Sequence, residues 1–233
     1  MLNKTKKISS RSRRRGTKTR KIRRYALLIS GAAFFILLGC GIFSFFEKGR
    51  TDETMSRQKV LPKITIDTKL LKKNKYSRPG IALKEVKSVV VHYTANPGTD
   101  ALDNRNYFNN LPKLNENKKS PTFASSHFVV GLKGQIIQCI PLNEIAYASN
   151  DRNTDSIAIE CCHPDKTGKF NALTYKALVE LVSYLCIRYD LSEQDVIRHY
   201  DVTGKKCPLY FVQHEDEWET FKKDVGKCLP LTV

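Results

Sequence analysis

The sequence predicts an α/β domain in which helices flank a mixed central β-sheet, preceded by one N-terminal transmembrane helix. Apolar, β-branched runs typical of buried strands alternate with segments whose apolar residues recur at helical spacing, and this alternation predicts the domain. An uncharged run at residues 25–46 predicts the membrane helix. With 233 residues, 41% of them hydrophobic, the chain is long enough for one domain with its own core.

The net charge of +17 is concentrated at the N-terminus. Residues 1–24 hold 12 of the 40 Lys and Arg residues and no Asp or Glu, which leaves the rest of the chain at only +5. Such a basic flank is typical of the end of a membrane helix that stays in the cytoplasm. A nucleic-acid-binding arm would have the same charge, but this segment lacks interleaved aromatic residues that stack on bases. We therefore expect a cytoplasmic tail and no nucleic-acid partner.

The uncharged run at residues 25–46 has the length of a membrane span. In helical form its 22 residues extend about 33 Å, close to the roughly 30 Å hydrocarbon core of a bilayer. It is longer than the apolar part of a cleaved signal peptide, and no cleavage pattern of small residues follows it. Residues 37–40 (LLGC) resemble the site at which lipoproteins are cut and acylated, so lipidation of Cys40 stays an alternative. The favoured arrangement is a single-pass protein of the cell membrane with its domain outside the cell.

The segment between the span and the domain, residues 47–84, is polar and rich in Lys, and it contains Pro62 and Pro79. This composition is typical of an extended stalk, the last third of which can pack on the domain as a leading arm. The domain itself is expected at residues 85–230.

Strands and helices are expected to interleave along the domain. The expected strands are at residues 86–92, 127–131, 135–141, 156–161 and 196–199. The expected helices are at residues 100–111, 174–189 and around residues 218–225. Because only a short turn separates them, the second and third strands predict a hairpin. The helix at 174–189 has the clearest apolar face.

Three side chains that can bind a metal lie at or near predicted strand ends: His92, His199 and Cys207. Strand ends hold side chains rigidly and leave one side open to solvent, as a catalytic metal requires. Two imidazoles and one thiolate suit Zn²⁺ with a fourth position for water. By residue type alone, however, two of five histidines and one of seven cysteines can share this pattern by chance, so a structural role is the simpler interpretation.

Two segments resemble the zinc-ligand motifs of N-acetylmuramoyl-L-alanine amidases of the phage-endolysin and peptidoglycan-recognition-protein type. They are residues 89–96 (VVVHYTAN) and residues 198–208 (RHYDVTGKKCP). Further similar segments follow in the order of the family, at residues 125–130, 140–142 and 153–160. The resemblance covers residues 85–228 and does not extend to the tail, the span or the stalk.

The resemblance implies a zinc hydrolase that cleaves the amide bond between N-acetylmuramic acid and L-alanine in peptidoglycan, from a domain that faces the cell wall. It implies that His92, His199 and Cys207 bind zinc. Glu160 would accept a proton from the attacking water and return it to the departing amine, and Lys205 would stabilise the oxyanion. Zn²⁺ is then the cofactor and peptidoglycan the partner, and we expect a monomer.

Four further residues match positions near the cleft of the family. His127 is expected to contact a ligand or the substrate rather than to bind the metal itself. Thr94, Asn96 and Asn153 either contact sugar or peptide or cap turns.

The chain also departs from the family pattern. Residues 146–149 (AYAS) stand where many members have a Trp-His pair, which leaves the substrate contacts of this loop open.

Asp201 is expected either to orient a ligand imidazole or to cap a loop. His163 and His214 lie in polar segments, and we expect both to be exposed.

Two other functions remain as alternatives. A peptidoglycan-binding module of the same fold would not hydrolyse its ligand, and a related zinc hydrolase could act on a free muropeptide or another acylated amino sugar. A ligand set with one vacant position, accompanied by Glu160, favours hydrolysis.

Overall fold

Six strands form one sheet in the order β1-β4-β3-β5-β2-β6 in a computed structural model, which describes residues 61–230. The strands are β1 (Ile66–Thr68), β2 (Ser88–Tyr93), β3 (Phe128–Val130), β4 (Ile136–Gln138), β5 (Ser156–Cys161) and β6 (Val196–Arg198). Neighbouring strands are parallel except for β3 and β4, which form the expected antiparallel hairpin. The sheet is therefore mixed, as the sequence predicts.

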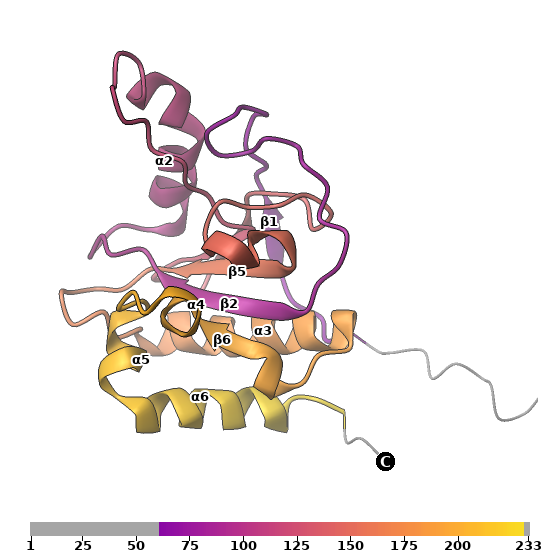
Figure 1. Cartoon of the computed structure of the whole chain (residues 1–233). Coiled ribbons are helices and arrows are strands. Elements are labelled where there is room, and N and C mark those ends of the chain that lie inside the picture. The colour runs from indigo at the N-terminus through magenta and orange to yellow at the C-terminus, as the bar shows by residue number, and fades with distance from the viewer. Residues whose placement is uncertain (1–60, 231–233) are drawn as a thin grey trace, which may run out of the picture. The chain divides into compact units, whose positions relative to one another are not determined.

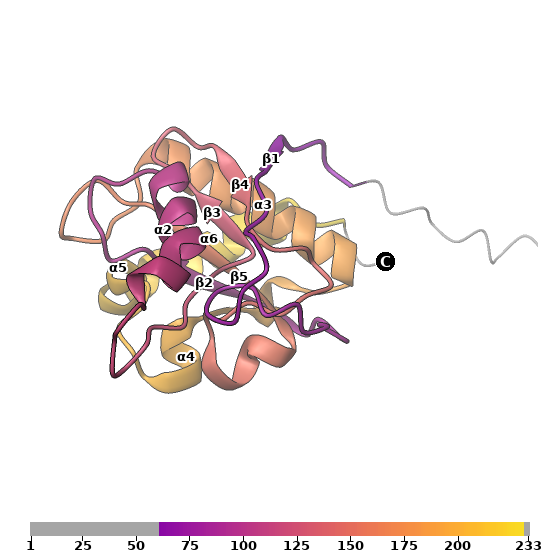
Figure 2. The same ribbon diagram turned by 90° about the horizontal axis from the view of Figure 1, so that it is seen from above.

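Helices cover both faces of this sheet, with α2 on one side and α3 and α6 on the other (Figures 1 and 2). The helices are α2 (Ala101–Leu114), α3 (Ala172–Tyr189), α4 (His199–Thr203), α5 (Leu209–Gln213) and α6 (Glu215–Lys227), with short 3₁₀ turns η1 (Asn150–Thr154) and η2 (Glu193–Asp195). The mixed α/β architecture expected from the sequence is confirmed.

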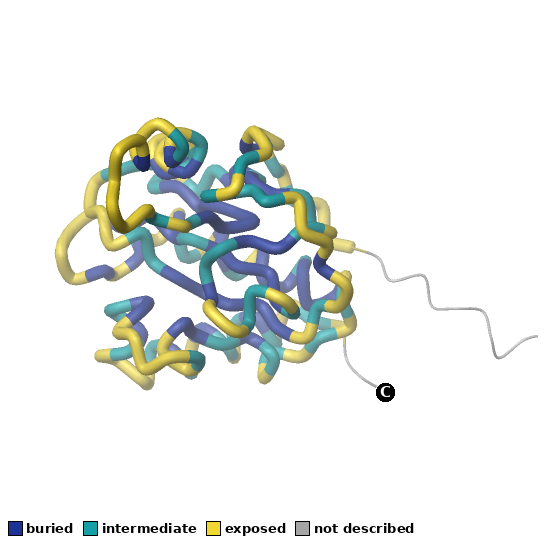
Figure 3. Tube along the Cα trace, turned by 45° about the horizontal axis from the view of Figure 1, so that its top comes forward, coloured by how far each residue is buried: buried dark blue, intermediate teal, exposed yellow. Residues whose placement is uncertain are grey.

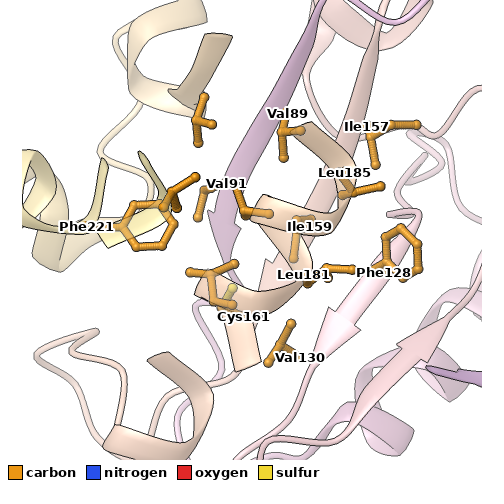
Figure 4. Close-up of a cluster of buried hydrophobic side chains, with 14 of the residues drawn as sticks. Val89, Val91, Phe128, Val130, Ile157, Ile159, Cys161, Leu181, Leu185 and Phe221 are labelled. Atoms are coloured by element: carbon orange, nitrogen blue, oxygen red, sulfur yellow. The ribbon is translucent and has the colours of Figure 1, made fainter. Parts of the chain in front are cut away.

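The core lies on both faces of the sheet because side chains alternate along each strand. On one face Val89 and Val91 of β2 pack with Leu181 and Leu185 of α3 and with Phe221 of α6 (Figure 4). On the other face, residues of β3 and β4 pack against α2. Burial on both sides explains why Val89, Val90 and Val91 form an uninterrupted apolar run in β2. Figure 3 shows the buried strands surrounded by exposed loops.

The segment before β2 packs on the domain from Ile64 onwards. β1 pairs with β4, and Leu71 is buried. Arg78 donates two hydrogen bonds of 2.8 Å to the carboxylate of Glu144, which joins this leading arm to the loop that follows β4.

The structure contains β1 and α5, which the sequence analysis did not expect, and two predicted segments differ in extent or type. Helix α2 continues through Pro112 to Leu114, where the backbone N–H of Asn115 caps the carbonyl of Leu111. The segment from His199 to Thr203 forms a helix, because the carboxylate of Asp201 accepts a hydrogen bond from the backbone N–H of Arg198 and so starts a helical turn.

The expected localisation as a single-pass membrane protein requires correction. Within residues 61–230 no helix has both the length and the apolar composition to cross a bilayer. The expected tail, the expected span and Cys40 all lie outside the described residues.

Candidate metal centre

His92, His199 and Cys207 lie together, and their ligand atoms are all within 4.8 Å of one another. His92 ends the buried part of β2, and His199 directly follows β6. Because Val91 pairs with Arg198 in the parallel β2-β6 ladder, the two histidines that follow lie next to each other, with ring centroids 4.8 Å apart. The neighbouring strands thus bring together two side chains that are more than 100 positions apart in the sequence.

Cys207 reaches the two histidines because the chain turns back after α4. Gly204 ends this helix with φ of 75°, a left-handed conformation that glycine adopts without steric cost. The backbone N–H of Tyr200 then donates to the carbonyl of Cys207 at 2.9 Å. As a result the Cys207 Sγ lies 3.8 Å from the His92 Nδ1, and the thiol is 2% exposed.

The outer nitrogens of both imidazoles have polar neighbours. His92 Nε2 lies 3.0 Å from Ser149 Oγ, and His199 Nε2 lies 3.0 Å from Asn150 Oδ1. Each Nδ1 is thereby left for the side of the ring that faces the other ligands. Ser149 and Asn150 lie outside the two ligand motifs, so no sequence pattern indicated these contacts.

Burial shifts the pKa values of all three side chains in the direction that favours their neutral forms. Burial lowers the pKa of His92 well below its usual value, and His199 and Lys205 lower it further. Burial and the charge of Lys205 also lower the pKa of His199, so both rings are neutral, as metal ligands must be. Burial raises the pKa of the Cys207 thiol to about 12. A thiolate in this place therefore needs a strong positive charge beside it, which a divalent metal provides.

Glu160 lies beside the three ligand-type residues, since it pairs in register with His92 across β2 and β5. Its Oε2 is buried and has no hydrogen-bond partner among residues 61–230. Burial raises the pKa of Glu160 to about 8, while the positive charge of Lys205 lowers it. The carboxyl group is thus mostly protonated at neutral pH, and a cation bound beside it would favour its ionised form.

One cavity of about 370 Å³ is lined by the three ligand-type residues, by Glu160 and by Lys205. The other lining residues are Tyr93, Phe108, Phe123, Ala124, Ser125, Tyr147, Ala148, Asn150 and Asn153. Phe123 is 51% exposed, and its ring centroid lies 5.3 Å from that of Tyr76 and 5.9 Å from that of Tyr147. Part of the cavity lining is therefore aromatic, and another part consists of the ligand-type residues and Glu160.

The structure brings one of the four further residues into this cavity. Asn153 lines it, and its Oδ1 accepts hydrogen bonds from the backbone N–H groups of Ala148 and Ser149. Thr94 and Asn96 do not line it. The Thr94 Oγ1 is buried without a hydrogen-bond partner among the described residues, and Asn96 is exposed in a turn.

His127 is fully buried between strands and does not line the cavity. Its Nδ1 accepts from the backbone N–H of Ala158 at 3.0 Å, and its Nε2 lies 2.9 Å from the carbonyl oxygen of Glu144. Both ring nitrogens are therefore used by the backbone, which is the arrangement of a structural histidine.

Two other expectations have clear outcomes. The prediction that His163 is exposed is wrong, because its side chain is 1% exposed and its ring packs 5.1 Å from that of Tyr93. Asp201 caps α4 and pairs with Arg198 at 2.8 Å rather than contacting a ligand imidazole.

Comparison with known proteins agrees with this arrangement. Residues 82–209 match the family described as N-acetylmuramoyl-L-alanine amidase. The chain is 40% identical over 171 residues to the N-acetylmuramoyl-L-alanine amidase CwlL of Bacillus licheniformis, which covers 68% of this chain and 46% of CwlL. It is 36% identical over 173 residues to the amidase BlyA of Bacillus subtilis, which covers 65% of this chain and 44% of BlyA. The chain thus spans about half the length of the curated relatives that it matches.

Solved structures show the same fold. The catalytic domain of XlyA is 30% identical with a TM-score of 0.57, over 70% of this chain and 100% of that domain. PlyL is 27% identical with a TM-score of 0.58, over 73% of this chain and 100% of PlyL. The match of more than half of the sequence and the shared fold lead to one conclusion: the chain belongs to the N-acetylmuramoyl-L-alanine amidase family.

Proposed function

We propose that this chain is a zinc-dependent N-acetylmuramoyl-L-alanine amidase, which hydrolyses the amide bond between N-acetylmuramic acid and L-alanine in bacterial peptidoglycan. Residues 85–230 would form its catalytic domain. Family membership supports the proposal. The observation that carries it is the cluster of His92, His199 and Cys207 beside a buried carboxylate oxygen of Glu160 that no described residue satisfies.

The three proposed ligands fit Zn²⁺ in chemistry, and one pair of ligand atoms is also close to the spacing that the ion requires. Two neutral imidazoles and a thiol are a common donor set for a catalytic zinc site with an open fourth position. Around a tetrahedral zinc the ligand nitrogen and sulfur are roughly 3.5 Å apart. The distance of 3.8 Å between His92 Nδ1 and Cys207 Sγ is close to this value. When bound, the ion would supply an acidified water as nucleophile and polarise the carbonyl of the substrate.

Glu160 is the proposed proton carrier. A carboxyl with a pKa near 8 is close to the ideal for general acid-base catalysis at neutral pH, because it can accept and return a proton with little cost. The nitrogen of L-alanine leaves poorly as an anion. The same carboxyl would therefore protonate it after taking the proton of the attacking water.

Lys205 is the proposed stabiliser of the oxyanion that forms during attack. It lines the cavity, and its charge influences the pKa values of His92, His199 and Glu160, which places it in the same electrostatic field. A fixed cation in a partly enclosed cavity stabilises developing negative charge much more than a cation in water.

Hydrolysis is favoured over binding alone by two features. A module that only binds peptidoglycan has no need of a thiol beside two histidines. Nor does it need a buried carboxyl group without a hydrogen-bond partner among the described residues, since such a group reduces stability. The cavity presents both to the ligand.

The proposal can be tested with the purified full chain and purified peptidoglycan. The release of new L-alanine amino termini would identify the cleaved bond, and the absence of new reducing sugar ends would separate amidase from glycosidase activity. Cys207→Ser and Glu160→Gln serve as inactive controls. If the wild-type chain binds peptidoglycan but releases no L-alanine amino termini, the binding-module alternative holds instead.

A further inference from the structure

One short turn contacts both of the proposed ligand histidines. Ser149 precedes η1, and Asn150 is its first residue. Ser149 Oγ lies 3.0 Å from His92 Nε2, and Asn150 Oδ1 lies 3.0 Å from His199 Nε2. The turn thus approaches both rings at Nε2, although it is 57 and 49 positions away from them in the sequence. On His92, the Cys207 Sγ lies near the other ring nitrogen, Nδ1.

The chemistry of these contacts selects one form of each imidazole. A metal binds the lone pair of a neutral ring, so the other nitrogen must carry the hydrogen. The Oδ1 of Asn150 can only accept a hydrogen bond, which requires that His199 carries its hydrogen on Nε2 and keeps the lone pair on Nδ1. The Ser149 hydroxyl can accept in the same way from His92. Both rings are therefore directed with Nδ1 toward the centre of the cluster.

The turn itself is held rigidly. Asn153 Oδ1 accepts hydrogen bonds from Ala148 N at 3.0 Å and from Ser149 N at 2.7 Å, so a single amide oxygen fixes the backbone before the turn. Arg152 donates at 2.8 Å to Ser88 Oγ at the beginning of β2. The strand that carries His92 is consequently attached to the turn at both of its ends.

The backbone conformation of Asn150 also suits this purpose. Its φ is 52°, in the left-handed region that Asn occupies more readily than most residues. This conformation belongs to the turn that directs the Asn150 side chain toward His199. Glycine would adopt the same backbone without strain but would lack the oxygen.

We propose that Ser149 and Asn150 are positioning residues of the metal centre, which hold His92 and His199 in the tautomer and rotation that present Nδ1 to the metal, with Asn153 fixing the turn. The inference rests on the proposed function, because it requires that the histidines bind zinc. It adds that zinc affinity depends on a turn outside the two ligand motifs. Outer partners of this kind typically contribute about 10- to 100-fold to metal affinity.

The test is the zinc affinity of the full chain, measured with Zn²⁺ alone in competition with a chromophoric chelator. Asn150→Gly removes the oxygen and keeps the backbone conformation, and we expect it to weaken zinc binding by about 10- to 100-fold. Ser149→Ala should act in the same direction. Asn150→Asp retains an acceptor oxygen and should restore affinity. Thr154→Ala is the matched control, because the Thr154 hydroxyl lies in the same turn and bonds only to the carbonyl of Asp151.

Two further readouts separate positioning from a loss of folding. The metal-free variants should unfold at the same denaturant concentration as the metal-free wild type, and the Co²⁺-loaded Asn150→Gly chain should show a changed visible spectrum. Unchanged affinity in both Asn150→Gly and Ser149→Ala would overturn the inference while leaving the proposed function intact. A wild-type chain that binds no zinc would overturn both.

Discussion

His92 Nδ1 lies 3.8 Å from Cys207 Sγ, although 115 positions separate the two residues. The contact depends on the parallel pairing of β2 with β6 and on the return of the chain after α4. Because these elements also build the core, the ligand cluster is part of the fold rather than an addition to it.

Glu160→Gln should reduce the rate of peptidoglycan hydrolysis by about 10²- to 10⁴-fold, the range for loss of a general acid-base group. Gln has nearly the same shape but cannot transfer the proton. Zinc content should be unchanged, because Glu160 is not one of the clustered ligand residues. Steady-state rates and metal analysis of the same sample check both statements. Activity close to that of wild type would assign the proton transfer to another group.

Lys205→Ala should lower kcat by about 10²- to 10³-fold through loss of oxyanion stabilisation. The neighbouring Lys206 offers a matched control, since it has the same charge but does not line the cavity. Lys206→Ala should keep kcat within about twofold of wild type, as expected for a surface substitution. Equal losses in the two variants would point to a general effect of surface charge instead.

Phe123→Ala should raise KM for soluble peptidoglycan fragments by about fivefold with a smaller change in kcat. Phe123 is 51% exposed at the wall of the cavity, and an aromatic contact of this kind contributes about 1 kcal/mol to binding. Tyr107 on α2 is a suitable control, because it is 45% exposed and does not line the cavity. A KM that rises equally in Tyr107→Ala would argue against a substrate contact at Phe123.

The stability of the metal-free chain should fall as pH is lowered from about 6.5 to about 4, partly because of His127. Burial lowers the pKa of His127 to about 4, and its hydrogen bond with the carbonyl of Glu144 raises it. Between these pH values the unfolded chain takes up a proton that the folded chain does not. The contribution of His127 is therefore complete above pH 6.5 and decreases by about 3 kcal/mol down to pH 4.

Denaturant unfolding at pH 7 and pH 4.5 in the presence of a chelator measures this effect. His127→Gln keeps one donor and one acceptor but does not titrate, so its stability should depend less on pH than that of wild type. The same pH dependence in both proteins would show that other groups dominate acid unfolding.

The fold could be predicted from the sequence wherever burial imposed a periodic pattern. The apolar run of β2 and the apolar face of α3 predicted their elements because the sheet is covered on both sides. Segment 199–203 was expected as a strand end and loop. It forms α4 because Asp201 caps the backbone at Arg198, a local hydrogen bond that outweighs the strand propensity of the preceding residues.

The candidate site could be predicted only where it coincided with a motif. His92, His199 and Cys207 lie in motifs that resemble those of the family. Ser149 and Asn150 contact the histidines only because a turn folds back onto them, and no sequence pattern predicts that turn. His163 was misplaced because its neighbours are polar, yet its ring is covered by Tyr93. Burial created by distant segments leaves no local pattern.

Removal and restoration of the metal tests the central claim most directly. The full chain would be freed of metal with a chelator, its zinc content measured by mass spectrometry, and its release of L-alanine amino termini followed as Zn²⁺ is added back. We predict that hydrolysis is lost with the metal and returns at about one Zn²⁺ per chain, the stoichiometry of a three-ligand catalytic site, in wild type but not in Cys207→Ser. Undiminished hydrolysis by a chain without bound zinc would contradict the account.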